Sequence, residues 1–174
     1  TKDRISSEAL LRRIIKGENM WNINNIVDNL NLISASYKFP MGYVDVKTIK
    51  GNIVVRKTKE DEKFIKIGGS EKKCKGTEIC VADDEKIIDF GFATSDSDLT
   101  KVTENTKELL ILIYATKDID DSYLKKAIQD SKQLLAKITK FELIEEGITS
   151  SDVKKSEIKE EKSKEKMEQP KQDN

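Results

Sequence analysis

Asn22 to Asp45 reads N-I-N-N-I-V-D-N-L-N-L-I-S-A-S-Y-K-F-P-M-G-Y-V-D, and this stretch decides the fold. Its apolar residues recur every three or four positions, a spacing that buries one face of a helix. They are Ile23, Ile26, Val27, Leu30, Ile33 and Tyr37. Asparagine is a poor helix former because its side chain competes for backbone hydrogen bonds, yet the predicted helix carries Asn24, Asn25, Asn29 and Asn31. Helix stability therefore does not explain these polar residues.

Two of the asparagines, Asn24 and Asn25, stand where a helix N-cap is expected, because a side-chain oxygen there accepts an unpaired backbone N–H. Asp28 and Asn31 lie one turn apart on one face, and we do not expect them to be caps. Two interpretations remain open for this face. It holds a loop or a ligand, or it pins the helix to a turn at residues 40–45.

The rest of the chain predicts a layered α+β domain with a mixed β-sheet flanked by helices. Ser6 or Ser7 can cap a first helix that ends at Gly17, and Asp120 or Asp121 can cap a long last helix. The apolar run 109–114 predicts a central strand covered on both faces. Further strands are expected at 52–57, 63–68, 78–83 and 86–92, with turns at 59–61 and 83–85.

Composition limits the function classes. The 174 residues include 32 basic and 32 acidic ones, so contact with RNA requires a local patch, because the whole chain carries no net field. No run of 18 apolar residues occurs, which predicts a cytoplasmic protein with no membrane segment. We expect one domain at residues 1–147. The remaining residues, 148–174, are expected to form a disordered charged tail, because fourteen of the last 23 residues are charged.

Catalytic chemistry is narrowed by the absence of histidine, which excludes Ser–His and Cys–His nucleophilic systems. Cys74 and Cys80 are too few to hold zinc, and Cys80 is expected to be a small core residue. No paired carboxylates or phosphate-binding glycine loop is apparent. From the residues alone we assign no reaction, no metal and no cofactor.

A family resemblance rests on an ordered series of short motifs. It begins with Ile23-Asn24-Asn25-Ile26-Val27-Asp28, Asn31, Pro40 and Asp45, and continues through Gly51, Ile53-Val54-Val55-Arg56, Gly68-Gly69, Val81-Ala82-Asp83, Gly91, Val102-Thr103 and Thr106-Lys107. Over about residues 19 to 115 the chain resembles the editing (B3/B4) domain of the phenylalanyl-tRNA synthetase beta subunit. The resemblance implies an α+β fold and hydrolysis of the ester of a wrongly charged tRNA, the logic of a second sieve.

Carried over residue by residue, the resemblance predicts an altered pocket. Asn31 matches a family asparagine at the amino-acid site, Gly42 stands where the family has a histidine, and Leu112 stands about where it has a glutamate. Thr94 and Ser95 replace two glycines; they either bind a carboxylate, an amine or a ribose, or cap their own loop. The expected substrate-binding residues are Asn31, Gly42, Tyr43, Gly91, Thr94 and Ser95, with structural support from Asn24, Asn25, Asp28, Pro40, Asp45 and Arg56; no catalytic residue is assigned.

The leading hypothesis is a stand-alone editing-type domain, not a complete synthetase, that binds an amino acid or an aminoacyl-tRNA end and hydrolyses mischarged aminoacyl-tRNA. The alternative is a non-catalytic module that binds a small metabolite, RNA or protein on the same scaffold. Two basic groups can contact tRNA or serve only solubility. They are Lys2, Arg4, Arg12, Arg13 and Lys16, and Lys125, Lys126, Lys132, Lys137 and Lys140.

Overall fold

The computed structural model describes residues 5–20, 22–91 and 96–149. Contacts divide the chain into two units, Thr1–Phe141 and Glu142–Asn174, and every described helix and strand lies in the first unit. The predicted ligand residues Thr94 and Ser95, and most of the expected tail, fall outside the described residues. Among the helices that are described, none is long and apolar enough to cross a membrane.

The described helices are α1 Ser6–Ile15, α2 Asn25–Tyr37, the 3-10 helix η1 Val46–Thr48 and α3 Asp121–Ile138. The predicted caps Asn24 and Asp120 are confirmed. The Asn24 side chain accepts the Val27 N–H at 2.9 Å, and Asp120 accepts the Ser122 N–H at 2.7 Å. Each cap satisfies a backbone donor that the helix itself leaves unpaired.

The predicted cap of the first helix, Ser6 or Ser7, is wrong. Ile5 is the N-cap of α1, and the Ser7 hydroxyl instead donates to the Lys38 carbonyl at 3.3 Å, which ties α1 to the end of α2. Asp28 is not a cap, as expected, because its carboxylate accepts the N–H of Ile23, which precedes the N-cap Asn24, at 3.0 Å. It holds the incoming chain against the first turn of α2. A serine hydroxyl or an aspartate carboxylate can bond backbone groups away from the expected cap position, and spacing alone does not identify these partners.

Seven strands pair antiparallel, as β1–β7, β2–β5–β6 and β3–β4. Their bounds are β1 Met41–Asp45, β2 Val54–Lys57, β3 Glu60–Ile65, β4 Glu71–Lys75, β5 Ile79–Ala82, β6 Ile87–Asp89 and β7 Leu109–Ile113. The predicted turn at 40–45 is therefore wrong, since it is β1. β4 was not predicted, and β7 pairs with β1 alone among the described strands, so it is not a central strand. The α+β class is confirmed.

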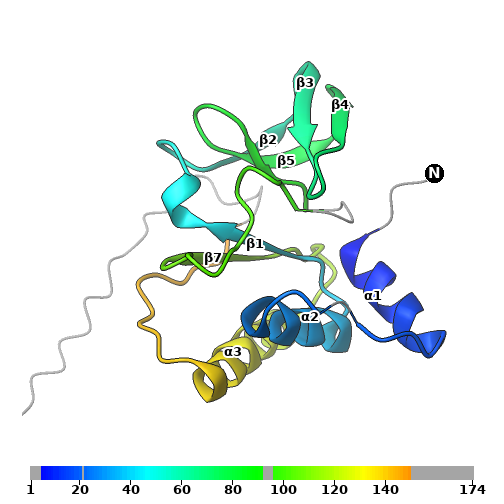
Figure 1. The fold of residues 1–174 in the computed structure, drawn as a ribbon, viewed down its shortest axis with the longest axis vertical. Coiled ribbons are helices and arrows are strands. Elements are labelled where there is room, and N and C mark those ends of the chain that lie inside the picture. Colours follow the sequence, from blue (N-terminus) through cyan, green and yellow to red (C-terminus); the bar gives the residue numbers. More distant parts are fainter. Residues whose placement is uncertain (1–4, 21, 92–95, 150–174) are drawn as a thin grey trace, which may run out of the picture. The chain divides into compact units, whose positions relative to one another are not determined.

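Two apolar cores lie on opposite sides of the β1–β7 pair. Figure 1 shows α2 and α3 on one side of these strands and β2 to β5 on the other. The helix-side core contains Val27, Leu30, Ile33, Met41, Tyr43 and Leu135. The strand-side core contains Phe64, Cys74, Cys80, Ala82, Ile87 and Phe90, so Cys80 is the core residue predicted. Burial raises the pKa of the Cys80 thiol to about 11, which keeps it protonated and unreactive.

Candidate functional site

The two faces of β1 carry different chemistry because successive strand residues point to opposite sides. Met41 and Tyr43 enter the helix-side core. Gly42, between them, faces the strand side, where a Cβ added to it would collide with the carboxyl group of Asp89. Glycine at this position therefore allows the end of β6 to approach β1. Leu112 pairs with Gly42 in the register of β1 and β7.

Tyr114 links this carboxyl group to Gly91. Its backbone N–H donates to the Pro40 carbonyl at 3.0 Å, which continues the pairing of β7 with the start of β1. Its ring lies against Gly91 so closely that a Cβ there would collide with the ring atoms, and its hydroxyl donates to the Asp89 carboxylate. Gly42, Asp89, Gly91 and Tyr114 thus form one contiguous group, which we call the glycine-lined site.

The electrostatics of the glycine-lined site disfavour negative charge. Burial raises the pKa of Asp89, which is 2% exposed, against the opposing effect of hydrogen bonds from Tyr114 and the Phe90 N–H. Burial also raises the pKa of Asp96, and the charge on Asp89 raises it further. For Tyr114, burial and then Asp89 raise the pKa well above its usual value. Burial therefore favours the protonated, uncharged form of both carboxyl groups, whose pKa values are raised.

Asn31 and Tyr43 form a second polar pair, on the helix side of β1. The Tyr43 hydroxyl donates to the Asn31 side-chain oxygen at 3.3 Å. Burial, followed by the charges of Asp96 and Asp89, raises the pKa of Tyr43. The four described residues predicted to bind substrate therefore fall into two groups, Asn31 with Tyr43 and Gly42 with Gly91. The charges of Asp96 and Asp89 act on the first group through the Tyr43 hydroxyl.

Three residues predicted to support the site act at the start of α2. Asn24 caps the helix, and Asp28 bonds the residue before that cap, as described above. Asn25 is exposed, and its carbonyl accepts the Asn29 side-chain amide at 2.7 Å. These contacts fix where α2 begins and hence where Asn31 meets β1. In the described structure, Asn24, Asn25 and Asp28 support the backbone at the start of α2.

The other three predicted supports are spread over the domain. The carbonyl of Pro40 holds Tyr114. Asp45, at the end of β1, accepts the Lys47 N–H at 3.0 Å and the Thr106 hydroxyl at 2.8 Å, so it anchors η1 and the turn at 103–106. Arg56 makes a two-pronged pair with Glu62 at 2.6 and 2.8 Å on the strand side. Of these three, Pro40 hydrogen-bonds a member of the glycine-lined site, Tyr114.

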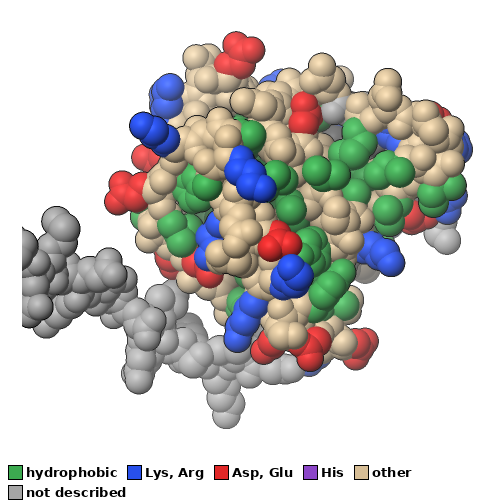
Figure 2. Space-filling model, turned by 90° about the horizontal axis from the view of Figure 1, so that it is seen from below, with side chains coloured by type: hydrophobic (Ala, Val, Ile, Leu, Met, Phe, Trp, Pro, Cys, Tyr) green, Lys and Arg blue, Asp and Glu red, His purple; other side chains and the backbone are tan. Residues whose placement is uncertain are grey.

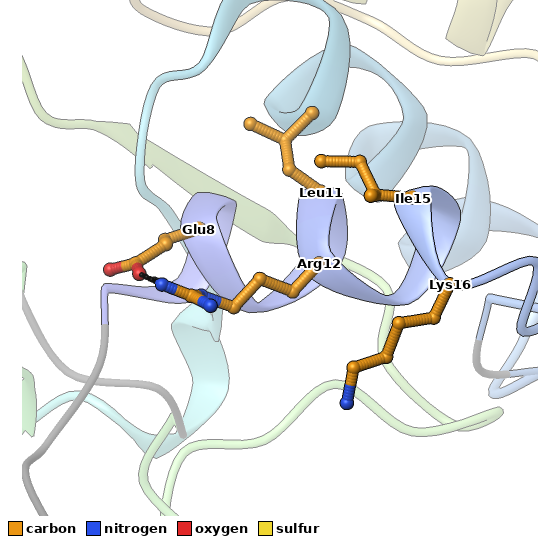
Figure 3. Close-up of a pocket in the computed structure, with 5 residues that line it drawn as sticks. All are labelled: Glu8, Leu11, Arg12, Ile15 and Lys16. Carbon is orange, nitrogen blue, oxygen red and sulfur yellow. Dashed lines mark hydrogen bonds and ion pairs between the residues drawn. The ribbon is translucent and has the colours of Figure 1, made fainter.

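Two shallow hollows lie on the helix side. One, of about 400 Å³, is lined by Glu8, Leu11, Arg12, Ile15 and Lys16 of α1; the other, of about 450 Å³, lies between α2 and α3. Figure 3 shows Glu8 paired with Arg12 and Leu11 and Ile15 directed away from that pair. Figure 2, a view from the helix side, shows apolar side chains scattered among charged ones. Neither hollow is lined by a residue of the glycine-lined site.

Sequence reasoning missed Asp89, Asp96 and Tyr114. The signal for Asp89 was present, because an aspartate inside the apolar run Ile87-Ile88-Asp89-Phe90 is rarely buried without a specific partner. Tyr114 was assigned to the end of a strand. No group of three or more potential metal-ligating His, Cys, Asp or Glu side chains occurs within the part of the chain that the structure describes.

Comparison with known proteins identifies relatives of one kind. The family described as the B3/4 domain matches residues 1–140. The chain is 31% identical over 101 residues to the phenylalanine–tRNA ligase beta subunit of Fusobacterium nucleatum, covering 58% of this chain and 12% of that protein. It is 30% identical over 89 residues to the same subunit of Aquifex aeolicus (51% and 11%), and 27% identical over 170 residues to that of Desulfotalea psychrophila (84% and 21%). The chain thus spans only a small part of each relative.

Proposed function

Because the chain belongs to the B3/4 domain family, we propose that it binds the aminoacyl end of a tRNA and hydrolyses the ester that joins a wrong amino acid to the RNA. One observation carries the proposal. Gly42 lies against the buried Asp89 carboxyl group, whose pKa burial raises, and Gly91, far away in sequence, lies against the ring of Tyr114, whose hydroxyl donates to that same carboxyl group. Perturbed acids of this kind cluster at functional sites more than elsewhere.

The reaction requires little from the protein. A water oxygen attacks the ester carbonyl carbon, the bond to the ribose oxygen breaks, and the water proton passes to that oxygen, releasing free amino acid and intact RNA. Since the chain has no histidine, Asp89 and Asp96 are the described acids suited to carry the proton. The Asn31–Tyr43 pair would orient the substrate from the other face of β1.

Contact with RNA is expected to be weak, because several surface cations already form ion pairs with carboxylates. On α1, Arg12 pairs with Glu8 at 2.8 Å and Arg13 with Glu18 at 3.1 Å. On α3, Lys126 pairs with Asp130 at 3.2 Å. We therefore expect weak tRNA binding that falls steeply as salt rises, since each neutralised phosphate releases counterions.

The decisive experiment is a deacylation assay over a panel of mischarged tRNAs. Release of amino acid by the wild-type chain should exceed spontaneous hydrolysis for at least one of them, and Asp89→Asn should lose most of that rate while remaining folded. Asp84→Asn, an exposed neighbour on the same hairpin, is the matched control and should keep full activity. Spontaneous rates across the whole panel would refute hydrolysis.

A non-catalytic binding module is the second candidate. The observation that favours it is that Asp89 and Tyr114 fill the space beside both glycines, as a packed structural core would. Titration of the chain with total tRNA at low salt, and with free amino acids, separates the two candidates. Binding without deacylation supports the module, and deacylation supports the enzyme.

A further inference from the structure

We propose that the glycine-lined site selects a small amino acid, of the size of alanine or serine, and rejects aromatic ones. This inference rests on the proposed function, because it names the substrate class of the same site. It is argued from the space that the chain's own side chains occupy.

The two glycines of the site carry no side chains, but the space beside each is already filled by another residue of the protein. The Asp89 carboxyl group occupies the position that a side chain on Gly42 would take. The Tyr114 ring does the same at Gly91. An aromatic substrate needs a gap of the size of a ring, and here the ring present is part of the protein.

Tyr114 is held at three points, so displacing it is costly. Its N–H bonds the Pro40 carbonyl, its hydroxyl bonds Asp89, and its ring contacts Gly91. Displacement would break the contact with Asp89, leaving a buried carboxyl group without its phenol donor. A substrate side chain of one or two heavy atoms avoids this cost because it leaves the Tyr114–Asp89 pair in place.

The polarity of the glycine-lined site also disfavours aromatic substrates. An apolar ring placed beside Asp89 would further desolvate a carboxyl group that is already 2% exposed. A hydroxyl group on a small side chain could instead bond to the carboxylate. We therefore expect deacylation to be about tenfold or more faster for small than for aromatic amino acids, within the range that pocket size alone can discriminate.

The test measures deacylation of alanyl-, seryl-, phenylalanyl- and tyrosyl-tRNA by the wild-type chain and by two variants at position 114. Tyr114→Ala removes the ring and should raise the rates on the aromatic substrates by about tenfold relative to the small ones. Tyr114→Phe keeps the ring and removes the hydroxyl, so it should retain the preference for small substrates. Tyr114→Leu is a second way to replace the ring by a smaller side chain if Tyr114→Ala does not fold.

The outcomes separate the two proposals. Faster deacylation of phenylalanyl- or tyrosyl-tRNA by the wild-type chain overturns the size inference and leaves the hydrolase intact. Deacylation of none of the four, with activity on another member of the wider panel, likewise overturns the inference alone. Absence of activity on every mischarged tRNA overturns the proposed hydrolase and the inference with it. If neither enlarged variant folds, the wild-type preference decides.

Discussion

Two buried aspartates of the β5–β6 hairpin, Asp83 at the start of its turn and Asp89 at the end of β6, are 5% and 2% exposed and have opposite surroundings. Asp83 bonds the Lys86 ammonium at 2.6 Å and the backbone N–H groups of Lys50, Glu85 and Lys86. Although burial alone would raise its pKa, these partners lower it to about 2. Asp89 has a phenol partner and a second carboxyl group nearby, and burial raises its pKa.

The difference separates an acid with a structural role from a candidate catalytic acid in one hairpin. The ionised Asp83 carboxylate is stabilised by a cation and several donors, so it fixes the loop at 48–51 to the turn at 83–86. Asp89 is buried where its charge is disfavoured, in contact with two segments brought from elsewhere in the chain. A buried carboxyl group whose charged form is disfavoured is more typical of a functional site than of a purely structural one.

The largest expected effect comes from breaking the stabilised member of the pair. Asp83→Ala should lower the free energy of unfolding by about 3 kcal/mol, because it leaves the Lys86 ammonium and three backbone donors without their acceptor. Since the folded pKa lies below the ordinary value, this stabilisation is present above about pH 4 and is lost only as the pH falls toward 2. Urea unfolding at neutral pH measures the loss.

The matched control for this prediction is Asp84→Ala, at the exposed neighbouring position. It should change the free energy of unfolding by no more than about 0.5 kcal/mol. Equal losses in the two variants would contradict the assignment of Asp83 as the anchor.

The next effect tests the close approach at Gly42. Gly42→Ala should cost about 2 kcal/mol, because the new methyl group overlaps the Asp89 carboxyl group. In the double variant with Asp89→Ala the overlap disappears, so the two changes should be non-additive by at least about 1 kcal/mol in urea unfolding. Gly147→Ala, where an added Cβ meets no atom within 4 Å, is the control. Strict additivity would show that the two residues do not touch.

The smallest effect concerns the pH dependence of stability. Because the folded pKa of Asp89 is raised, stability is fully present below about pH 4 and falls as the pH rises through the raised value. Tyr114 and Asp96 face this carboxyl group, and Asp96 shifts in the same direction. Asp89→Asn, which cannot ionise, should be more stable than wild type by about 1 kcal/mol at pH 8 and equal to it at pH 4.

Urea unfolding of both proteins at pH 4, 6 and 8 measures this difference. An identical pH profile for the two proteins would show that Asp89 is ionised in the folded chain at no cost. The comparison with Asp83 would then lose its basis.

Strong periodicity and capping residues made the helices predictable. The apolar spacing in α2 and the caps Asn24 and Asp120 depend on local rules, which sequence reveals. β4 was missed because four of its five residues, Glu71-Lys72-Lys73-Cys74-Lys75, are charged and its burial comes from Cys74 alone. β1 was mistaken for a turn because Pro40 and Gly42 are typical of turns, whereas here the glycine serves close packing.

The candidate site was predictable only in part, for a physical reason. The family resemblance gave Asn31, Gly42, Tyr43 and Gly91, whose role as binding residues is still a prediction. Asp89 and Tyr114 come together through the pairing of β1 with β7 and the packing of β6 on β1, which are tertiary contacts that local pattern does not encode. The apolar run around Asp89 showed that this aspartate was unusual, whereas only the fold showed that its partner is Tyr114.

The order of strands has a consequence for how the chain folds. β1 pairs with β7, so every residue from 46 to 108 lies within the loop that this pairing closes. The hairpins β3–β4 and β5–β6 inside that loop connect neighbouring segments, and their local contacts can form before the long loop closes. We therefore expect the strand side to gain hydrogen-exchange protection early in refolding and the helix-side core to complete late, when β7 and α3 arrive. The glycine-lined site, built from both ends of that loop, would be among the last parts of the molecule to exist.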